Sequence, residues 1–168
     1  MTEYIKYLRA FVGHRPVLQV GASIIVEDED GRVLLQKRRD NHCWGYHGGA
    51  VELDERVEDA AARELFEETG LIADEMHLWR VFSGPETHYV YPNGDEVSNI
   101  DLVFVCRKYH GEIRRQESEV EELKFFALEE IPENLSPPIA GALKAYVQMR
   151  GHERGIKAAE EQNGSAGV

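Results

Sequence analysis

The chain lacks the features that mark several classes of protein. Its only cysteines, Cys43 and Cys106 in 168 residues, have no neighbouring Cys or His residues that would complete a zinc site. Its longest apolar runs are a handful of residues, too short to span a bilayer. The first residues mix Glu3, Lys6 and Arg9 among apolar side chains, which excludes a signal-peptide core there. We therefore expect a cytoplasmic protein with no membrane contact, whose reducing surroundings leave both thiols unpaired.

Basic residues are also scarce. The chain has 19 Lys and Arg residues against 31 Asp and Glu residues, which gives a formal net charge of −12. Such a charge repels a long phosphate backbone, so we do not expect extended nucleic acid as a partner. A small anionic substrate is compatible with this charge if cations line its pocket. Because several acidic residues cluster in the sequence, that cluster is the first place to look for chemistry.

Sequence patterns divide the chain into an N-terminal helical extension (1–16), a central domain (17–150) and a C-terminal tail (151–168). The tail loses its apolar period, so we expect it to be flexible. The order of elements predicts an α/β fold, a mixed sheet covered by helices. The expected helices are 2–12, 56–69 and 139–150, the expected strands are 20–26, 32–36, 76–82, 87–91, 96–106 and 122–127, and 39–48 is expected to be a loop.

The helix expected at residues 56–69 concentrates acidic side chains. Glu64 and Glu68 are four residues apart and share one face, and Glu67 lies one turn from Glu64. Like charges at this spacing destabilise a helix by roughly a few tenths of a kcal/mol per pair. Near the C-terminus they also meet the negative end of the helix dipole. Either these carboxylates face water, or a hard divalent cation such as Mg²⁺, Mn²⁺ or Ca²⁺ relieves the repulsion.

Residues 48–71 read GGAVELDERVEDAAARELFEETGL. From Gly49 onward this segment matches the pattern G-x5-E-x7-R-E-U-x-E-E-x-G-U at every position, where U is a bulky aliphatic residue. Seven fixed residue types at ordinary frequencies give a chance match of about 10⁻⁹ per starting position. The segment resembles the Nudix box. The likeness continues more weakly through the elements on either side, over roughly residues 17–150.

This resemblance implies a Nudix-type α/β/α sandwich with a central mixed β-sheet, in which a loop–helix–loop binds Mg²⁺, with Mn²⁺ as a substitute. The metal ligands that it implies are the carboxylates of Glu64, Glu67 and Glu68 and the backbone carbonyl of Gly49. It also implies that Arg63 pairs with Glu55 and braces the loop against the helix. His47 and Asp54 stand where the family commonly has Pro and Gly, although neither is a defining position.

The family's chemistry is the attack of water on phosphorus, which needs a general base and cations for the phosphates. Glu67 is one candidate base. The other is a Glu from the acidic loop before the last strand, where Glu119 ranks first. Arg38 and Arg39 could offset substrate phosphates, and Tyr89 could stack on a nucleobase. The ordinary alternative for Glu119 is a solvated acidic loop, and that for Arg38 and Arg39 is an exposed basic loop. For Tyr89 the alternative is packing in the core or at the edge of the sheet.

The resemblance therefore implies a MutT-like, Mg²⁺-dependent pyrophosphohydrolase. Its substrate would be a nucleoside diphosphate linked to another group, such as a nucleoside triphosphate or ADP-ribose. One alternative is a fold relative that only binds nucleotides, which is expected to lose a box carboxylate. Another is an isomerase of isoprenoid diphosphates, which is expected in a longer chain with a different box. The intact box disfavours both. The sequence leaves a homodimer open.

Overall fold

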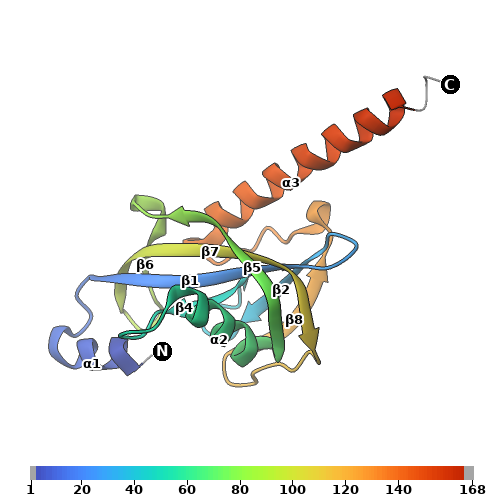
Figure 1. Cartoon of the computed structure of the whole chain (residues 1–168). Coiled ribbons are helices and arrows are strands. Elements are labelled where there is room, and N and C mark those ends of the chain that lie inside the picture. Colours follow the sequence, from blue (N-terminus) through green and yellow to red (C-terminus); the bar gives the residue numbers. More distant parts are fainter. Residues whose placement is uncertain (1–2, 165–168) are drawn as a thin grey trace.

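The computed structural model describes the backbone of residues 3–164 and the side chains of residues 3–155. Within this part of the chain, strands form one mixed sheet with helices against both faces (Figure 1). The helices are α1 (Glu3–Val12), α2 (Val57–Thr69) and α3 (Pro137–Gly164). The strands are β1 (Val17–Glu27), β2 (Val33–Arg38), β3 (Trp44–Gly45), β4 (His47–Ala50), β5 (Leu71–Phe82), β6 (His88–Val90), β7 (Glu96–Gly111) and β8 (Val120–Phe126).

Strand β1 is the centre of the sheet, whose main path runs β3-β2-β1-β7-β5. It is parallel to β7 along nearly its whole length, from Val17 opposite Val97 to Val26 opposite Cys106. On its other edge it pairs antiparallel with β2 and β4. β1 and β2 are consecutive strands that pair antiparallel, and so are β6 and β7.

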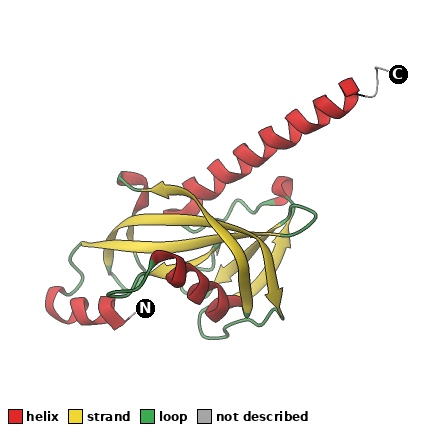
Figure 2. Ribbon diagram, viewed as in Figure 1, coloured by secondary structure: helices red, strands yellow, loops and turns green. Residues whose placement is uncertain are grey.

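The sheet buries a separate core on each face, because consecutive residues of a strand point to opposite sides. Ile24 packs in a cluster that includes Leu65 of α2, whereas Ile25 packs in a second cluster with Leu143 and Tyr146 of α3. All of these side chains are fully buried. Figure 2 shows the two helices on opposite sides of the sheet. The α/β/α sandwich with a mixed central sheet is therefore confirmed.

Helix α2 lies close to the sheet and ends where the sequence predicts. Ala60 and Ala61 are fully buried, and their small side chains let the helix approach the strands. Gly70 follows the last turn with φ +75°, and its N–H donates to the carbonyl of Phe66 over 2.8 Å. This left-handed conformation favours glycine and satisfies a carbonyl at the helix end. The carboxylates of the box are thus carried by a rigid helix.

Two expectations about strands are wrong. Residues 39–48 do not form a continuous loop, because β3 and the start of β4 lie in them. β4 reads His-Gly-Gly-Ala, without the β-branched residues that favour strands, so its pairing with β1 alone makes it a strand. β5 begins at Leu71 rather than at residue 76, and shifts in its pairing with β7 hide any regular alternation.

The expectation that the last helix ends at residue 150 is also wrong, because α3 continues to Gly164. Its first turns cover the sheet, and the rest projects away from it in Figure 1. The apolar period stops where the helix leaves the sheet, while residues 158–161 (AAEE) keep a high helix propensity. Flexibility of the tail stays a prediction, and residues 165–168 lie outside the described residues.

The structure also bears on the thiols and on the length of the helices. Cys43 and Cys106 are both free thiols. No helix within residues 3–164 has both the length and the apolar composition that crossing a bilayer requires.

Candidate active site

A cleft of about 770 Å³ lies beside α2, within the size range of small-ligand sites. Side chains from helices, strand ends and loops line it, so residues far apart in the sequence meet there. Those from the box are Gly48, Gly49, Ala50, Glu52, Arg63, Glu64, Glu67 and Glu68. Those from elsewhere are Glu3, Ile5, Gln19, Arg38, Arg39, Asp40, Tyr91, Pro92, Asn93, Gln116, Ser118 and Glu119.

The cleft brings together most of the side chains that the sequence singles out. Both arginines expected to meet phosphate, both candidate bases and every implied metal ligand line it: Arg38, Arg39, Glu67, Glu119, Glu64, Glu68 and Gly49. Tyr89 is not among the lining residues. Its ring packs edge-on against Tyr91, 4.9 Å between centroids, and it is Tyr91 that reaches the cleft.

Glu68 is the most firmly held of the carboxylates. Its side chain is 5% exposed, and three donors converge on Oε2: Gln36 Nε2 at 2.7 Å, His47 Nδ1 at 3.2 Å and the Gly48 N–H at 3.2 Å. Because Nδ1 faces a carboxylate, it carries the proton, and the buried Nε2 of His47 has no hydrogen-bond partner. Among the described side chains no donor contacts Oε1 of Glu68, so this oxygen is left for a ligand.

Glu64 lies against the backbone of β4. A Cβ atom on Gly49 would come within 2.8 Å of its carboxylate, so a larger residue there would have to displace that carboxylate. Burial raises the pKa of Glu64 to about 7, and the nearby charges of Glu68 and Glu67 add to this rise. The hydrogen bond from Arg63 Nη1, 2.7 Å from Oε1, opposes it only in part. The helix therefore concentrates more negative charge here than one arginine offsets.

Arg63 and Glu55 form the pair that the resemblance implies. Arg63 Nε donates to Oε1 over 2.7 Å, and Nη2 donates to Oε2 over 3.0 Å, a two-point contact that only a planar guanidinium can make. Nη2 also donates to the carbonyl of Ala50 at 3.3 Å, and Glu55 Oε2 accepts the N–H of Glu52 at 2.9 Å. The pair thus links α2 to the segment that precedes the box glutamate, at Ala50 and at Glu52.

The two departures from the family pattern have local explanations. Asp54 adopts φ +61°, the left-handed region in which Gly is most comfortable and Asp is tolerated. His47, the first residue of β4, is fully buried and donates to Glu68. A proline at residue 47 would fill that position without offering such a donor. The departure at His47 therefore adds a contact to the carboxylate cluster.

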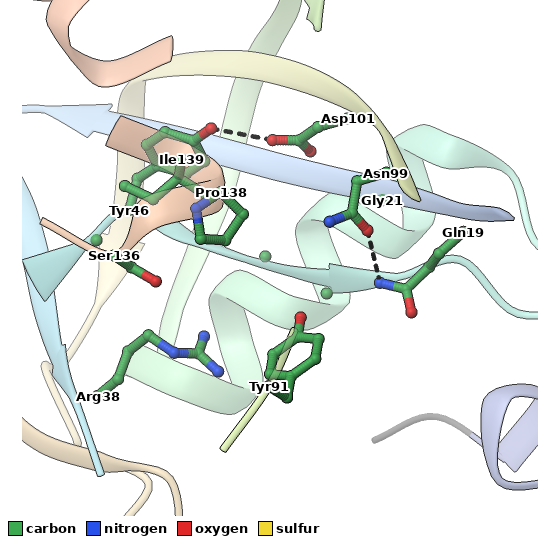
Figure 3. A pocket seen from close by; sticks show the side chains of 13 residues that line it. Gln19, Gly21, Arg38, Tyr46, Tyr91, Asn99, Asp101, Ser136, Pro138 and Ile139 are labelled. Atoms are coloured by element: carbon green, nitrogen blue, oxygen red, sulfur yellow. Dashed lines mark hydrogen bonds between the residues drawn. The ribbon is translucent and has the colours of Figure 1, made fainter. Parts of the chain in front are cut away.

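A recess opens beside the cleft, toward the α3 face of the sheet, and Figure 3 shows Arg38 and Tyr91 directed into it. Gln19 Nε2 donates to Asn99 Oδ1 over 3.1 Å on its wall. Deeper, burial raises the pKa of Asp101, although hydrogen bonds from Ser23 Oγ and Tyr46 OH oppose the rise. The recess is therefore polar and offers amide, hydroxyl and carboxyl groups to a ligand.

Four polar residues of the site and its recess were not predicted from the sequence: Gln36, Gln19, Asn99 and Asp101. Asp101 interrupts a run of apolar residues in β7 and is 8% exposed, whereas Gln36 follows such a run in β2, before Lys37, and is 2% exposed. A polar side chain within an apolar run needs a buried partner, so the interruption at Asp101 is the signal that could have found it. Gln36, Gln19 and Asn99 carry no such signal, because they lie near the ends of their strands rather than within a long apolar run.

The donor types around Glu64 suit a hard divalent cation, since all are carboxylate or carbonyl oxygens. Burial and, after it, the charges of Glu68 and Glu67 raise the pKa of Glu64, and a bound cation would favour the ionised carboxylate and oppose this rise. Within the residues that the structure describes, however, no three His, Cys, Asp or Glu side chains already converge tightly enough to hold a metal ion. The oxygen ligands are therefore of the type that a hard divalent cation prefers. Two of the carboxylates, Glu64 and Glu67, also contact Arg63, at 2.7 and 3.5 Å.

A family model of the NUDIX domain matches residues 17–146, which include all of the box and all the strands from β1 to β8. The chain belongs to the NUDIX family. The match begins at the first residue of β1 and leaves α1 outside it.

Curated relatives and solved structures agree with this membership. A Methanocaldococcus jannaschii protein named ADP-ribose pyrophosphatase is 36% identical over 108 residues, which span 62% of this chain and 60% of that protein. A MutT-like protein of Streptomyces ambofaciens is 33% identical over 121 residues, 72% of this chain and 71% of that one. The crystal structure of a MutT NUDIX hydrolase from Burkholderia pseudomallei has a TM-score of 0.65 and 31% identity, over 76% of this chain and 97% of that chain.

Proposed function

We propose that this NUDIX protein hydrolyses a pyrophosphate bond in a small nucleotide-like substrate, with Mg²⁺ as its cofactor and Mn²⁺ as a substitute. The substrate is a nucleoside diphosphate linked to another group. The observation that carries the proposal is that one cleft brings the three carboxylates in the last turns of α2 together with three arginines: Glu64, Glu67, Glu68, Arg38, Arg39 and Arg63. Carboxylates suit a hard cation, and guanidinium groups suit phosphate oxygens.

Mg²⁺ held by the three box carboxylates and the carbonyl of Gly49 would neutralise phosphate oxygens and lower the pKa of the attacking water. Gln36 and His47 hold Glu68, which lines the cleft, through its Oε2. Arg63 holds Glu64 against the strand. These contacts fix the carboxylates before the substrate arrives, which is what electrostatic catalysis requires.

Arg38 orients the phosphate side of the substrate. Its Nε and Nη2 donate to Asp40 over 2.9 and 2.8 Å, and this pairing fixes the guanidinium plane and leaves Nη1 for a ligand. Arg39 lines the cleft next to it. Its N–H donates to the carbonyl of Glu119 over 2.9 Å, so the basic and the acidic segments are joined there.

Glu67 and Glu119 remain the two candidates for the general base. The Glu67 side chain is 47% exposed, and Glu119 is exposed as well, so either could pass a proton to solvent. The pH dependence of kcat/KM for Glu67→Gln and Glu119→Gln separates them. Loss of the base removes the acidic limb of the profile, whereas loss of a residue that only binds lowers the rate at every pH.

ADP-ribose and nucleoside triphosphates are the leading substrates. The name of the Methanocaldococcus jannaschii relative supports the first, and the polar recess beside the cleft has groups that suit a nucleobase or ribose. The test is a panel of ADP-ribose and the common nucleoside triphosphates with Mg²⁺, read by chromatographic separation of the nucleotide products. ADP-ribose should give AMP and ribose 5-phosphate, and a nucleoside triphosphate should give the monophosphate with pyrophosphate or the diphosphate with phosphate. EDTA should abolish turnover, and Mg²⁺ or Mn²⁺ should restore it. Full activity in EDTA, or no turnover of any nucleotide in the panel, would contradict the proposal.

A further inference from the structure

Helix α1 is attached to the loop of the Nudix box through Glu52. The backbone N–H groups of Glu3 and Tyr4 donate to Oε1 and Oε2 of Glu52 over 2.7 and 3.0 Å. The first N–H groups of a helix have no partners inside it, and the helix dipole also favours a carboxylate at this end. Glu52 lies between Gly49 and Glu55 in the sequence. A side chain from the site's own loop therefore caps a helix that lies outside the NUDIX match.

The other end of α1 is attached to a second segment of the cleft wall. Arg9 Nη2 donates to the carbonyl of Glu96 over 2.7 Å, and Arg9 Nε lies 3.5 Å from Asp95 Oδ1. These partners end the turn between β6 and β7, whose Pro92 and Asn93 line the cleft. The Arg9 side chain is only 10% exposed, so solvent does not compete freely for these contacts.

Helix α1 therefore joins two parts of the wall and is itself a part of it. Glu3 and Ile5 line the cleft, and Ile5 is 5% exposed. In Figure 1, α1 lies at one end of the sheet, next to the loop that leads into α2. The cap at Glu52 and the anchor at Arg9 thus determine how far the cleft extends on this side.

We propose that α1 is a specificity-determining wall that admits compact nucleotides and excludes nucleotides that continue into a polynucleotide chain. This inference rests on the proposed function and narrows its substrate class. With α1 in place the cleft has about 770 Å³, a volume suited to one small ligand. A substrate that extends past its first nucleotide needs a further exit, and the net charge of −12 opposes its phosphates.

The test compares the cap variant Glu52→Ala with Glu52→Gln, which keeps one acceptor oxygen for the helix. The measured quantity is kcat/KM for a 5′-triphosphorylated oligoribonucleotide divided by kcat/KM for the matching nucleoside triphosphate. Hydrogen exchange of the amides of residues 3–12 reports whether α1 has detached. Glu52→Ala should raise the exchange and raise the ratio by at least about tenfold, the scale of a change in pocket shape. Glu52→Gln should change both much less.

Three outcomes would overturn the proposal. One is a wild-type protein that turns over the oligonucleotide as well as the free nucleotide. The second is a Glu52→Ala variant whose α1 exchanges faster while the ratio stays constant, and the third is a variant whose exchange does not change. Failure of the proposed function looks different, because no small nucleotide is then turned over. In that case the dissociation constants of the oligoribonucleotide and of the nucleoside triphosphate are measured instead. Equal affinities for the two would refute the exclusion of polynucleotides.

Discussion

Gln36 donates from Nε2 to Oε2 of Glu68 over 2.7 Å and so joins the interior of β2 to the carboxylate cluster on α2. Gln36 is 2% exposed and Glu68 4%. A hydrogen bond to a charged group in such surroundings fixes the carboxylate more firmly than an exposed contact would. The glutamine therefore acts as a positioning residue for Glu68 and lies behind the site rather than in it.

The first prediction follows from this contact. Gln36→Leu removes the donor and keeps an apolar side chain of similar length, so the fold should tolerate it. Glu68 should become less ordered, and kcat/KM should fall by about 10–100-fold, with a higher Mg²⁺ concentration needed for half-maximal rate. Kinetics at varied Mg²⁺ measure both effects. An unchanged Mg²⁺ dependence would show that Gln36 does not position Glu68, and an unchanged melting temperature controls for unfolding.

The second prediction separates the charge of Glu68 from its packing. Glu68→Gln keeps an acceptor for Gln36, His47 and the Gly48 N–H, and it removes one negative charge from a crowded helix face. The metal-free protein should be at least as stable as the wild type, while turnover should fall by about 10²-fold or more. Calorimetry in EDTA and steady-state kinetics in Mg²⁺ measure the two quantities. A large drop in melting temperature would assign Glu68 a structural role instead.

The third prediction concerns stability in acid and uses a group far from the cleft. Burial raises the pKa of Glu27, but hydrogen bonds from Arg150 and Tyr146 outweigh this effect, so the pKa lies below its usual value. A carboxyl with a lower pKa in the folded state stabilises the fold above its unfolded pKa of about 4.3. That contribution is lost as the pH falls from there through the folded pKa. Wild-type stability should therefore decrease steeply with pH in this window.

The matched variant is Glu27→Gln, which removes the titrating group. Arg150 Nε donates to Glu27 over 2.8 Å, and the arginine would be left without its main partner, at a cost of about 3 kcal/mol at neutral pH. Below pH 4.3 the variant should lose less stability per pH unit than the wild type. Urea denaturation across the pH range measures both. Parallel pH curves for the two proteins would mean that Glu27 is not the group responsible.

The sequence predicted the α2 helix well because local chemistry determines it. Ala60 and Ala61 favour a helix, and Gly70 ends it in a left-handed conformation that other residues avoid. The shared face of Glu64 and Glu68 follows from the same helical register. β4 was missed for the opposite reason, since only its pairing with β1 makes it a strand, and no local pattern encodes a partner's register.

The site was predictable where one segment carries it and unpredictable where several segments meet. Glu64, Glu67 and Glu68 lie on one helix, so spacing alone groups them. Gln36 reaches Glu68 across 32 residues, and Glu52 reaches Glu3 across 49. Such contacts depend on how the loop folds back over the sheet, which no single segment specifies.

The last prediction distinguishes bracing from chemistry at the pair formed by Glu55 and Arg63. The pair is held at two points, 2.7 and 3.0 Å, and each partner also contacts the segment that precedes Glu55, at Glu52 and Ala50. If it acts as one brace, Arg63→Lys should lower kcat/KM almost as much as Arg63→Ala, because lysine keeps the charge but loses the planar fork. The double variant Glu55→Gln, Arg63→Ala should be scarcely worse than the poorer single variant.

Arg63 also donates to Glu64, and that contact complicates the cycle. A loss confined to the bond with Glu64 would appear in Arg63→Ala and not in Glu55→Gln. A brace predicts comparable losses in both, since either substitution frees the loop from the helix. Fully additive losses in kcat/KM across the four proteins would show that the two residues act independently. The loop would then be positioned by its pairing with β1 alone, and Arg63 would act only through Glu64.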